Sequence, residues 1–132
     1  DWRYETGEIV ENEPLFVIYS PFGASSINMI WDSDTSFSLE DFDEEFAQRV
    51  VDIINAGLDL DFTLTMEWYE IIRFGNKESA VVYCSFVNDD WEVAVSELIT
   101  PTEKGTYFLT CSLINEGDAA PMINAVKSLA FN

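Results

Sequence analysis

Two short apolar segments open the chain and are followed by turn residues. The run over residues 15–19 ends at Pro21 and Gly23, as a strand does before a turn. In the next segment, residues 26–31, alternate side chains fall on opposite faces, with Ile27, Met29 and Trp31 together on one of them. We predict a strand for each segment.

The hydrophobic period then changes from two to between three and four residues. Such a stripe is typical of an amphipathic helix, and we predict one over residues 38–56, ended by a left-handed Gly57. The apolar side consists of Leu39, Phe42, Phe46, Val50, Ile53 and Ile54. The opposite, polar side carries Asp43, Glu44, Gln48, Asp52 and Asn55.

The second half of the chain contains four strand-like segments in succession, "TMEWYEIIRF", "SAVVYCSFV", "WEVAVSELI" and "GTYFLTCSLI". The short links "GNKE", "NDD" and "TPTEK" favour an antiparallel meander. Residues 80–87 are apolar on both faces, which indicates a sheet covered on both sides. A last amphipathic pattern predicts a helix over residues 118–129.

The order of these elements, with their sequences, resembles the PsbP-like family. The similarity is carried by "SINMIWD", "SLEDFDEEFAQRVVDII", "EWYEIIRFGNKESAVVYCSFV" and the closing "GTYFLTCSLINEGDAAPMINAVKSLAFN", and spans about residues 14–132. The resemblance implies an α+β fold: an α/β/α sandwich around an antiparallel sheet of about six strands. It also implies one domain over residues 1–132. The family's opening strand ends in a Pro…Trp pair, and this chain offers only Trp2, so that strand is expected to be missing or incomplete.

Charge and side-chain chemistry exclude several kinds of function. The chain has 6 basic and 25 acidic residues, for a net charge of −19, which opposes binding to nucleic acid or to anionic lipid. It contains no His, so catalysis that relies on a His base is excluded and a zinc site is not expected. The predicted meander separates Cys84 from Cys111 by two strand spacings, about 9.6 Å, which is too far for a disulfide. We therefore predict two free, buried thiols, and we interpret Trp31, Trp68 and Trp91 as core residues.

The segment "DSDTSFSLEDFDEE", residues 32–45, has two interpretations. Its Ser38 and Asp41 have the spacing of a capping box, with acidic residues in the first turns of the helix and Phe37 able to pack on Phe42. As the alternative, Asp32 and Asp34 could ligate calcium in a ligand-binding module that uses residues 32–43. An EF-hand is rejected, because Phe37 stands where its loop needs Gly.

The sequence thus predicts a non-catalytic protein-interaction or scaffold domain without a cofactor. The resemblance implies a secreted or lipid-anchored bacterial protein that contacts another protein or the cell envelope. Any lipid anchor would lie outside this chain and would be its one link to a membrane. The residues predicted to contact the partner are Glu40, Asp43, Glu44 and Asp52.

Overall fold

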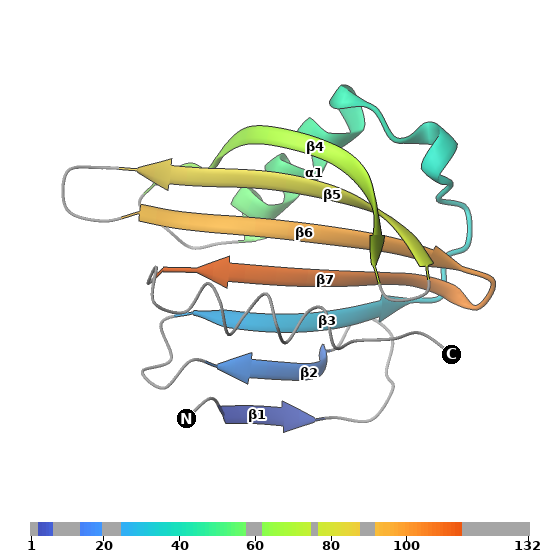
Figure 1. Cartoon of the computed structure of the whole chain (residues 1–132), viewed down its shortest axis with the longest axis horizontal. Coiled ribbons are helices and arrows are strands. Elements are labelled where there is room, and N and C mark those ends of the chain that lie inside the picture. Colours follow the sequence, from blue (N-terminus) through green and yellow to red (C-terminus); the bar gives the residue numbers. More distant parts are fainter. Residues whose placement is uncertain are drawn as a thin grey trace.

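Seven strands form one antiparallel sheet in a computed structural model that describes residues 3–6, 14–19, 25–57, 62–74, 77–87 and 92–114. The sheet order is β1-β2-β3-β7-β6-β5-β4, so that β1 and β4 are its two outer strands (Figure 1). The strands are β1 (Arg3–Thr6), β2 (Pro14–Tyr19), β3 (Ser26–Asp32), β4 (Thr65–Phe74), β5 (Lys77–Val87), β6 (Glu92–Thr102) and β7 (Gly105–Leu113). The α+β class and the antiparallel sheet are confirmed, and the strand beyond the predicted six is β1.

The predicted meander is present as β4, β5, β6 and β7, each paired with the next. Its last strand then pairs with β3, which comes from the first quarter of the chain. In that pairing Ile27 lies opposite Cys111 and Met29 lies opposite Leu109, so the buried positions of the two strands match. Because a shift by one residue would turn these side chains to the other face, burial fixes the register.

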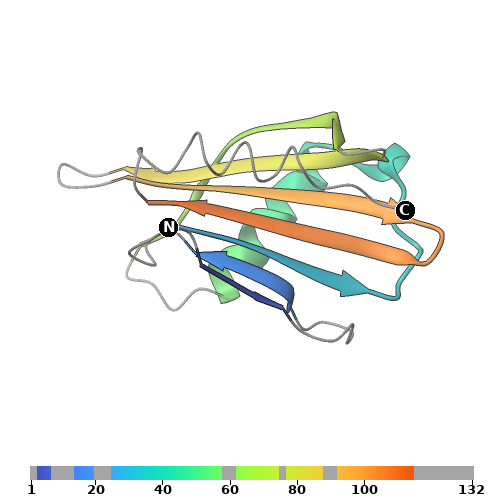
Figure 2. The same cartoon turned by 60° about the horizontal axis from the view of Figure 1, so that its bottom comes forward.

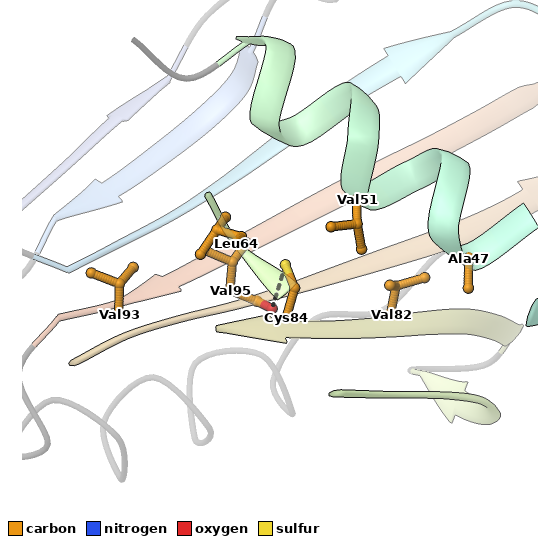
Figure 3. Packing of buried hydrophobic residues seen from close by; sticks show 7 residues of the cluster. All are labelled: Ala47, Val51, Leu64, Val82, Cys84, Val93 and Val95. Atoms are coloured by element: carbon orange, nitrogen blue, oxygen red, sulfur yellow. Dashed lines mark hydrogen bonds between the residues drawn. The ribbon is translucent and has the colours of Figure 1, made fainter. Parts of the chain in front are cut away.

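Apolar side chains are buried on both faces of the sheet. On one face, Val82 and Cys84 of β5 pack with Ala47 and Val51 of helix α1 (Glu44–Gly57) (Figure 3). On the other face, neighbouring Val81 belongs to a second cluster with Ile27, Met29, Leu98, Leu109 and Cys111. The two-sided burial predicted for β5 is confirmed. The predicted C-terminal helix over residues 118–129 lies outside the described residues.

The predicted helix over residues 38–56 is in fact two helices. A short 3-10 helix, η1 (Leu39–Asp41), precedes α1, and Phe42 between them has an extended backbone with φ −83° and ψ 116°. The Ser38 hydroxyl accepts a bond from the N–H of Glu40 and caps only η1. Asp43 caps α1, since its carboxylate accepts the N–H of Phe46 at 2.8 Å. The predicted helix start was therefore wrong, because the second cap competes with the first.

Two further details of the predicted helix were also wrong. Ile53 is 71% exposed, and the buried centre of the apolar side is formed by Ala47 and Val51. Among the described glycines only Gly105 has a positive φ, so Gly57 ends α1 without a left-handed conformation. Figure 2 shows α1 running diagonally across one face of the sheet, and this direction decides which residues of the stripe are covered. No helix among the described residues is both long and apolar enough to cross a membrane.

Candidate interaction surface

The four residues predicted to contact a partner are all exposed. Glu40 lies in η1, Asp43 caps α1, and Glu44 and Asp52 are spaced eight apart on α1 with Gln48 between them. The Gln48 amide donates to the Asp52 carboxylate at 3.0 Å, as expected for residues four apart on one side of a helix. We call Glu40, Asp43, Glu44 and Asp52 the acidic face.

The segment that carries the acidic face contains one basic residue. Arg49 is the single basic residue between positions 25 and 57, and its guanidinium lies 5.4 Å from the centre of the Phe46 ring. Arg49 therefore stacks on an aromatic side chain. Residues 32–52 contain eight acidic residues and this one basic residue, so the segment is strongly negative.

Asp32 and Asp34, the predicted calcium ligands, both bond to the backbone of the following loop. The N–H of Asp34 donates to Asp32 and the N–H of Ser36 donates to Asp34, each at 2.8 Å. Hydrogen bonds from Ser36 lower the pKa of the Asp34 carboxyl. The Thr106 hydroxyl anchors the loop by donating to the carbonyl of Asp34 at 2.9 Å. Within the described part of the chain no three His, Cys, Asp or Glu residues are grouped for a metal, and calcium binding stays a prediction.

A row of aromatic rings connects the acidic segment to the sheet edge. Ring centres lie 4.9 Å apart for Phe37 and Phe46, 5.8 Å for Phe46 and Phe42, 5.8 Å for Phe42 and Tyr69, and 5.9 Å for Tyr69 and Trp68. Phe37 thus packs on Phe46, not on Phe42 as predicted. The extended backbone of Phe42 explains the change, because it turns this ring toward β4.

Trp68, at the end of the aromatic row, is 59% exposed. The prediction that it is a core residue was wrong, because β4 is an outer strand of the sheet that the described residues form. Trp31 is half-buried, and Trp91 lies outside the described residues. Sequence reasoning missed Trp68 as a surface residue, since a Trp in a strand pattern carries no mark of edge position.

A β-bulge groups polar side chains around Trp68. The pairing of β4 with β5 shifts between Met66 and Trp68, leaving Glu67 as the extra residue. The Ser85 hydroxyl donates to Glu67 at 2.6 Å. Glu70 accepts two bonds of 3.2 Å, one from the Trp68 indole N–H and one from the Tyr83 hydroxyl. We call Glu67, Trp68, Glu70, Tyr83 and Ser85 the bulge cluster.

Solved structures with the same fold were found by comparison. Cyanobacterial PsbP (CyanoP) from Synechocystis sp. PCC 6803 is similar with a TM-score of 0.64 and 11% identity, over 96% of this chain and 77% of that one. The chain has a PsbP-like fold. Protein of unknown function PA94 from Pseudomonas aeruginosa is also similar, with a TM-score of 0.52, 10% identity and coverage of 100% and 85%. LpqN of Mycobacterium tuberculosis, involved in cell envelope biogenesis, aligns with a TM-score of 0.49, 14% identity and coverage of 98% and 76%. No protein-family model matches the sequence, and no curated protein matches it.

Among the residues that the structure describes, a single carboxylate is buried inside this PsbP-like fold. Glu97 of β6 is 7% exposed, and burial raises the pKa of its carboxyl to about 7. Sequence reasoning did not single it out among 25 acidic residues. The one available mark is its place in the strand, two residues after Val95 and two before Ile99, where an apolar side chain is expected.

The two thiols are free and buried, as predicted, and they lie on opposite faces of the PsbP-like sheet. The Cys84 thiol donates to the carbonyl of Val95 at 3.6 Å (Figure 3). Burial raises the pKa of Cys84 to about 11 and that of Cys111 to about 12. Because the thiolate is the nucleophile, neither side chain is suited to catalysis at neutral pH.

Proposed function

We propose that this chain is a non-catalytic binding domain that holds a basic protein partner against the acidic face. The observation that carries the proposal is the exposure of Glu40, Asp43, Glu44 and Asp52. Glu44 and Asp52 stand on α1, and Glu40 and Asp43 directly precede it. The opposite side of α1 is fixed to the sheet through Ala47, Val51 and the aromatic row. A rigid, negatively charged surface favours association with a positively charged one and discriminates against like-charged partners.

The absence of a catalytic role is part of the same proposal. It is supported by the chain's lack of His and by two protonated, buried thiols. The PsbP-like fold by itself assigns no activity. A location outside the cytoplasm is likewise proposed and rests on the sequence resemblance to PsbP-like lipoproteins.

Charge removal on the acidic face tests the proposal. The variant Glu40→Gln, Glu44→Gln, Asp52→Asn leaves Asp43 in place, because Asp43 caps α1. Its matched control is Glu78→Gln, Glu92→Gln, Glu103→Gln, which removes three exposed charges elsewhere. The partner is first recovered by cross-linking in the native envelope, then purified and titrated by calorimetry.

We expect the acidic-face variant to bind the purified partner about tenfold more weakly, and the control to change affinity less than about twofold. Most of the loss should appear in the association rate at low salt. Equal losses in the two variants, or an unchanged affinity in the first, would remove the acidic face from consideration.

A further inference from the structure

In the sheet that the described residues form, the outer edge of β4 combines an unpaired backbone edge with exposed apolar side chains. From Trp68 to Phe74 the strand pairs regularly with β5, and in the described part of the chain no strand pairs with its other edge. This stretch contains no Pro and no Gly, the residues that commonly interrupt pairing. Its Trp68 and Ile71 side chains are 59% and 49% exposed. Backbone groups on such an edge are free to pair with an added strand.

The bulge supplies charge at the beginning of this edge. It places Glu67 and Glu70 on either side of Trp68 in sequence, and both carboxylates bond toward β5 on the same face as Tyr83 and Ser85. The donors to these carboxylates, namely the hydroxyls and the indole N–H of the bulge cluster, are neutral. Neutral donors stabilise the carboxylates without cancelling their charge, so a cation placed there gains both Coulomb attraction and charge-assisted hydrogen bonds.

The exposed indole completes a site for an organic cation. An ammonium or guanidinium group over the face of a Trp is attracted by the ring quadrupole. Lys and Arg side chains also carry apolar stems, which suit an indole better than a bare metal ion does. A second copy of this chain, with its net charge of −19, is a poor occupant because like charges repel.

We propose that the outer edge of β4 accepts an extended basic peptide segment by strand addition, with one Lys or Arg side chain lying on Trp68 between Glu67 and Glu70. The backbone of the segment pairs along residues 68–74. This site lies on the sheet edge, uses none of the residues of the acidic face, and can exist whether or not the acidic face binds a partner.

The test uses the whole chain and a labelled synthetic peptide of about nine residues. The peptide contains three lysines, and its other positions are threonine and valine in alternation. Fluorescence anisotropy gives the affinity. A second peptide of the same sequence has alternate backbone amides N-methylated, which keeps its charge and removes the donors needed for strand pairing. The hydrogen-exchange rates of the backbone amides of residues 68–74, measured by NMR with and without peptide, report on strand pairing directly.

The matched protein variants are Glu67→Gln with Glu70→Gln, and Glu92→Gln with Glu103→Gln as the control of equal charge loss away from this edge. Gln keeps the acceptors for Ser85 and Tyr83, so the bulge should stay folded. We expect about tenfold weaker binding for the first pair, less than about twofold for the control, and about tenfold weaker binding of the N-methylated peptide. Within residues 68–74, exchange should slow at the alternate amides that point away from β5 when the unmodified peptide is added.

Equal binding of the methylated peptide would overturn strand addition, and equal losses in the two protein variants would overturn the cation site. The acidic-face variant of the preceding section separates the two proposals. A loss of peptide affinity in that variant with none in the Glu67 and Glu70 variant would assign the peptide to the acidic face and reject the edge site.

Discussion

The hydroxyl of Thr110 donates a 2.6 Å hydrogen bond to the buried carboxylate of Glu97 across the β6–β7 pair. The two residues are direct cross-strand neighbours, and Val82 lies opposite Glu97 on its other side. Desolvation raises the pKa of Glu97 to about 7, while the bond from Thr110 acts in the opposite direction. The Glu97 carboxylate thus lies beside apolar side chains, and the Thr110 hydroxyl stabilises its charged form.

Stability should fall as pH rises because of Glu97. Its pKa is about 7 in the folded chain and near 4.5 in the unfolded chain, so between these values the folded state binds more protons. The stabilisation is complete below about pH 4.5, is lost as pH rises through 7, and is absent above that. Relative to Glu97→Gln, we expect the free energy of unfolding to drop by on the order of 3 kcal/mol over this range. Urea unfolding at several pH values between about 5 and 8 measures the difference.

Thr110→Val provides the complementary variant. Removing the donor should raise the pKa of Glu97 further and move the loss of stability to higher pH. Identical pH dependence in the wild type and in Glu97→Gln would show that other carboxylates are responsible.

Gly105→Ala should destabilise the chain. Gly105 follows the β6–β7 turn with φ +141°, and an added Cβ would collide with the carbonyl oxygen of Asp32 and with the Trp31 indole. Because the strained backbone and the contact with a rigid strand act together, we expect a loss of about 2 kcal/mol or more. Gly57→Ala is the control, since nothing lies within 4 Å of its added Cβ. Thermal unfolding of both variants decides, and similar melting temperatures would contradict the expectation.

Asn55 fastens the end of α1 to the beginning of β4. Its side-chain oxygen accepts the N–H of Leu64 at 2.8 Å, and its amide donates to the carbonyl of Leu64 at 3.0 Å. Asn55→Ala leaves both partly buried backbone groups without these partners and should cost about 2 kcal/mol. Gln48→Ala, which removes an exposed bond to Asp52, should cost less than about 0.5 kcal/mol. Chemical denaturation of the two variants compares their losses of stability. Equal, small losses would show that the bonds of Asn55 to Leu64 do not stabilise the fold.

Both thiols should be unreactive in the folded chain. Cys84 is 2% and Cys111 7% exposed, and burial raises both pKa values well above 7, so thiolate is scarce and reagent access is blocked. We expect no rapid reaction with DTNB under native conditions and reaction of both cysteines in denaturant. A single fast native thiol would contradict the described burial.

Calcium should stabilise the chain no more than other salts of equal ionic strength. Asp32 and Asp34 each direct an oxygen to a backbone N–H, which gives both carboxylates a structural role without an ion. Thermal unfolding in millimolar calcium, magnesium and matched sodium chloride compares screening with binding. A rise of several degrees specific to calcium would favour the ligand-binding alternative.

Sequence pattern was sufficient where one local physical rule dominates. Alternation located β3, because burial of one face requires it. Apolar, strand-like segments bounded by turn residues located the four meander strands. The short turns gave their antiparallel order, and that order separated Cys84 from Cys111. The PsbP-like resemblance was confirmed at the level of the fold. The exposure of the acidic face could also be predicted from the sequence, since charged residues on the polar side of a helix usually remain in solvent.

Tertiary structure decided the features that depend on competition between local signals or on position in the sheet. Ser38 and Asp43 are both suitable caps, and the contact of Phe42 with Tyr69, distant in sequence, accompanies the break between η1 and α1. Asn55 was placed on the polar side by periodicity, yet it bonds to Leu64 because of where α1 ends. By itself the sequence determined the elements, their periods and the charge of the surface. Only the folded sheet decided that Trp68 is exposed and Glu97 buried, since burial depends on whether a strand ends up at the edge or in the middle.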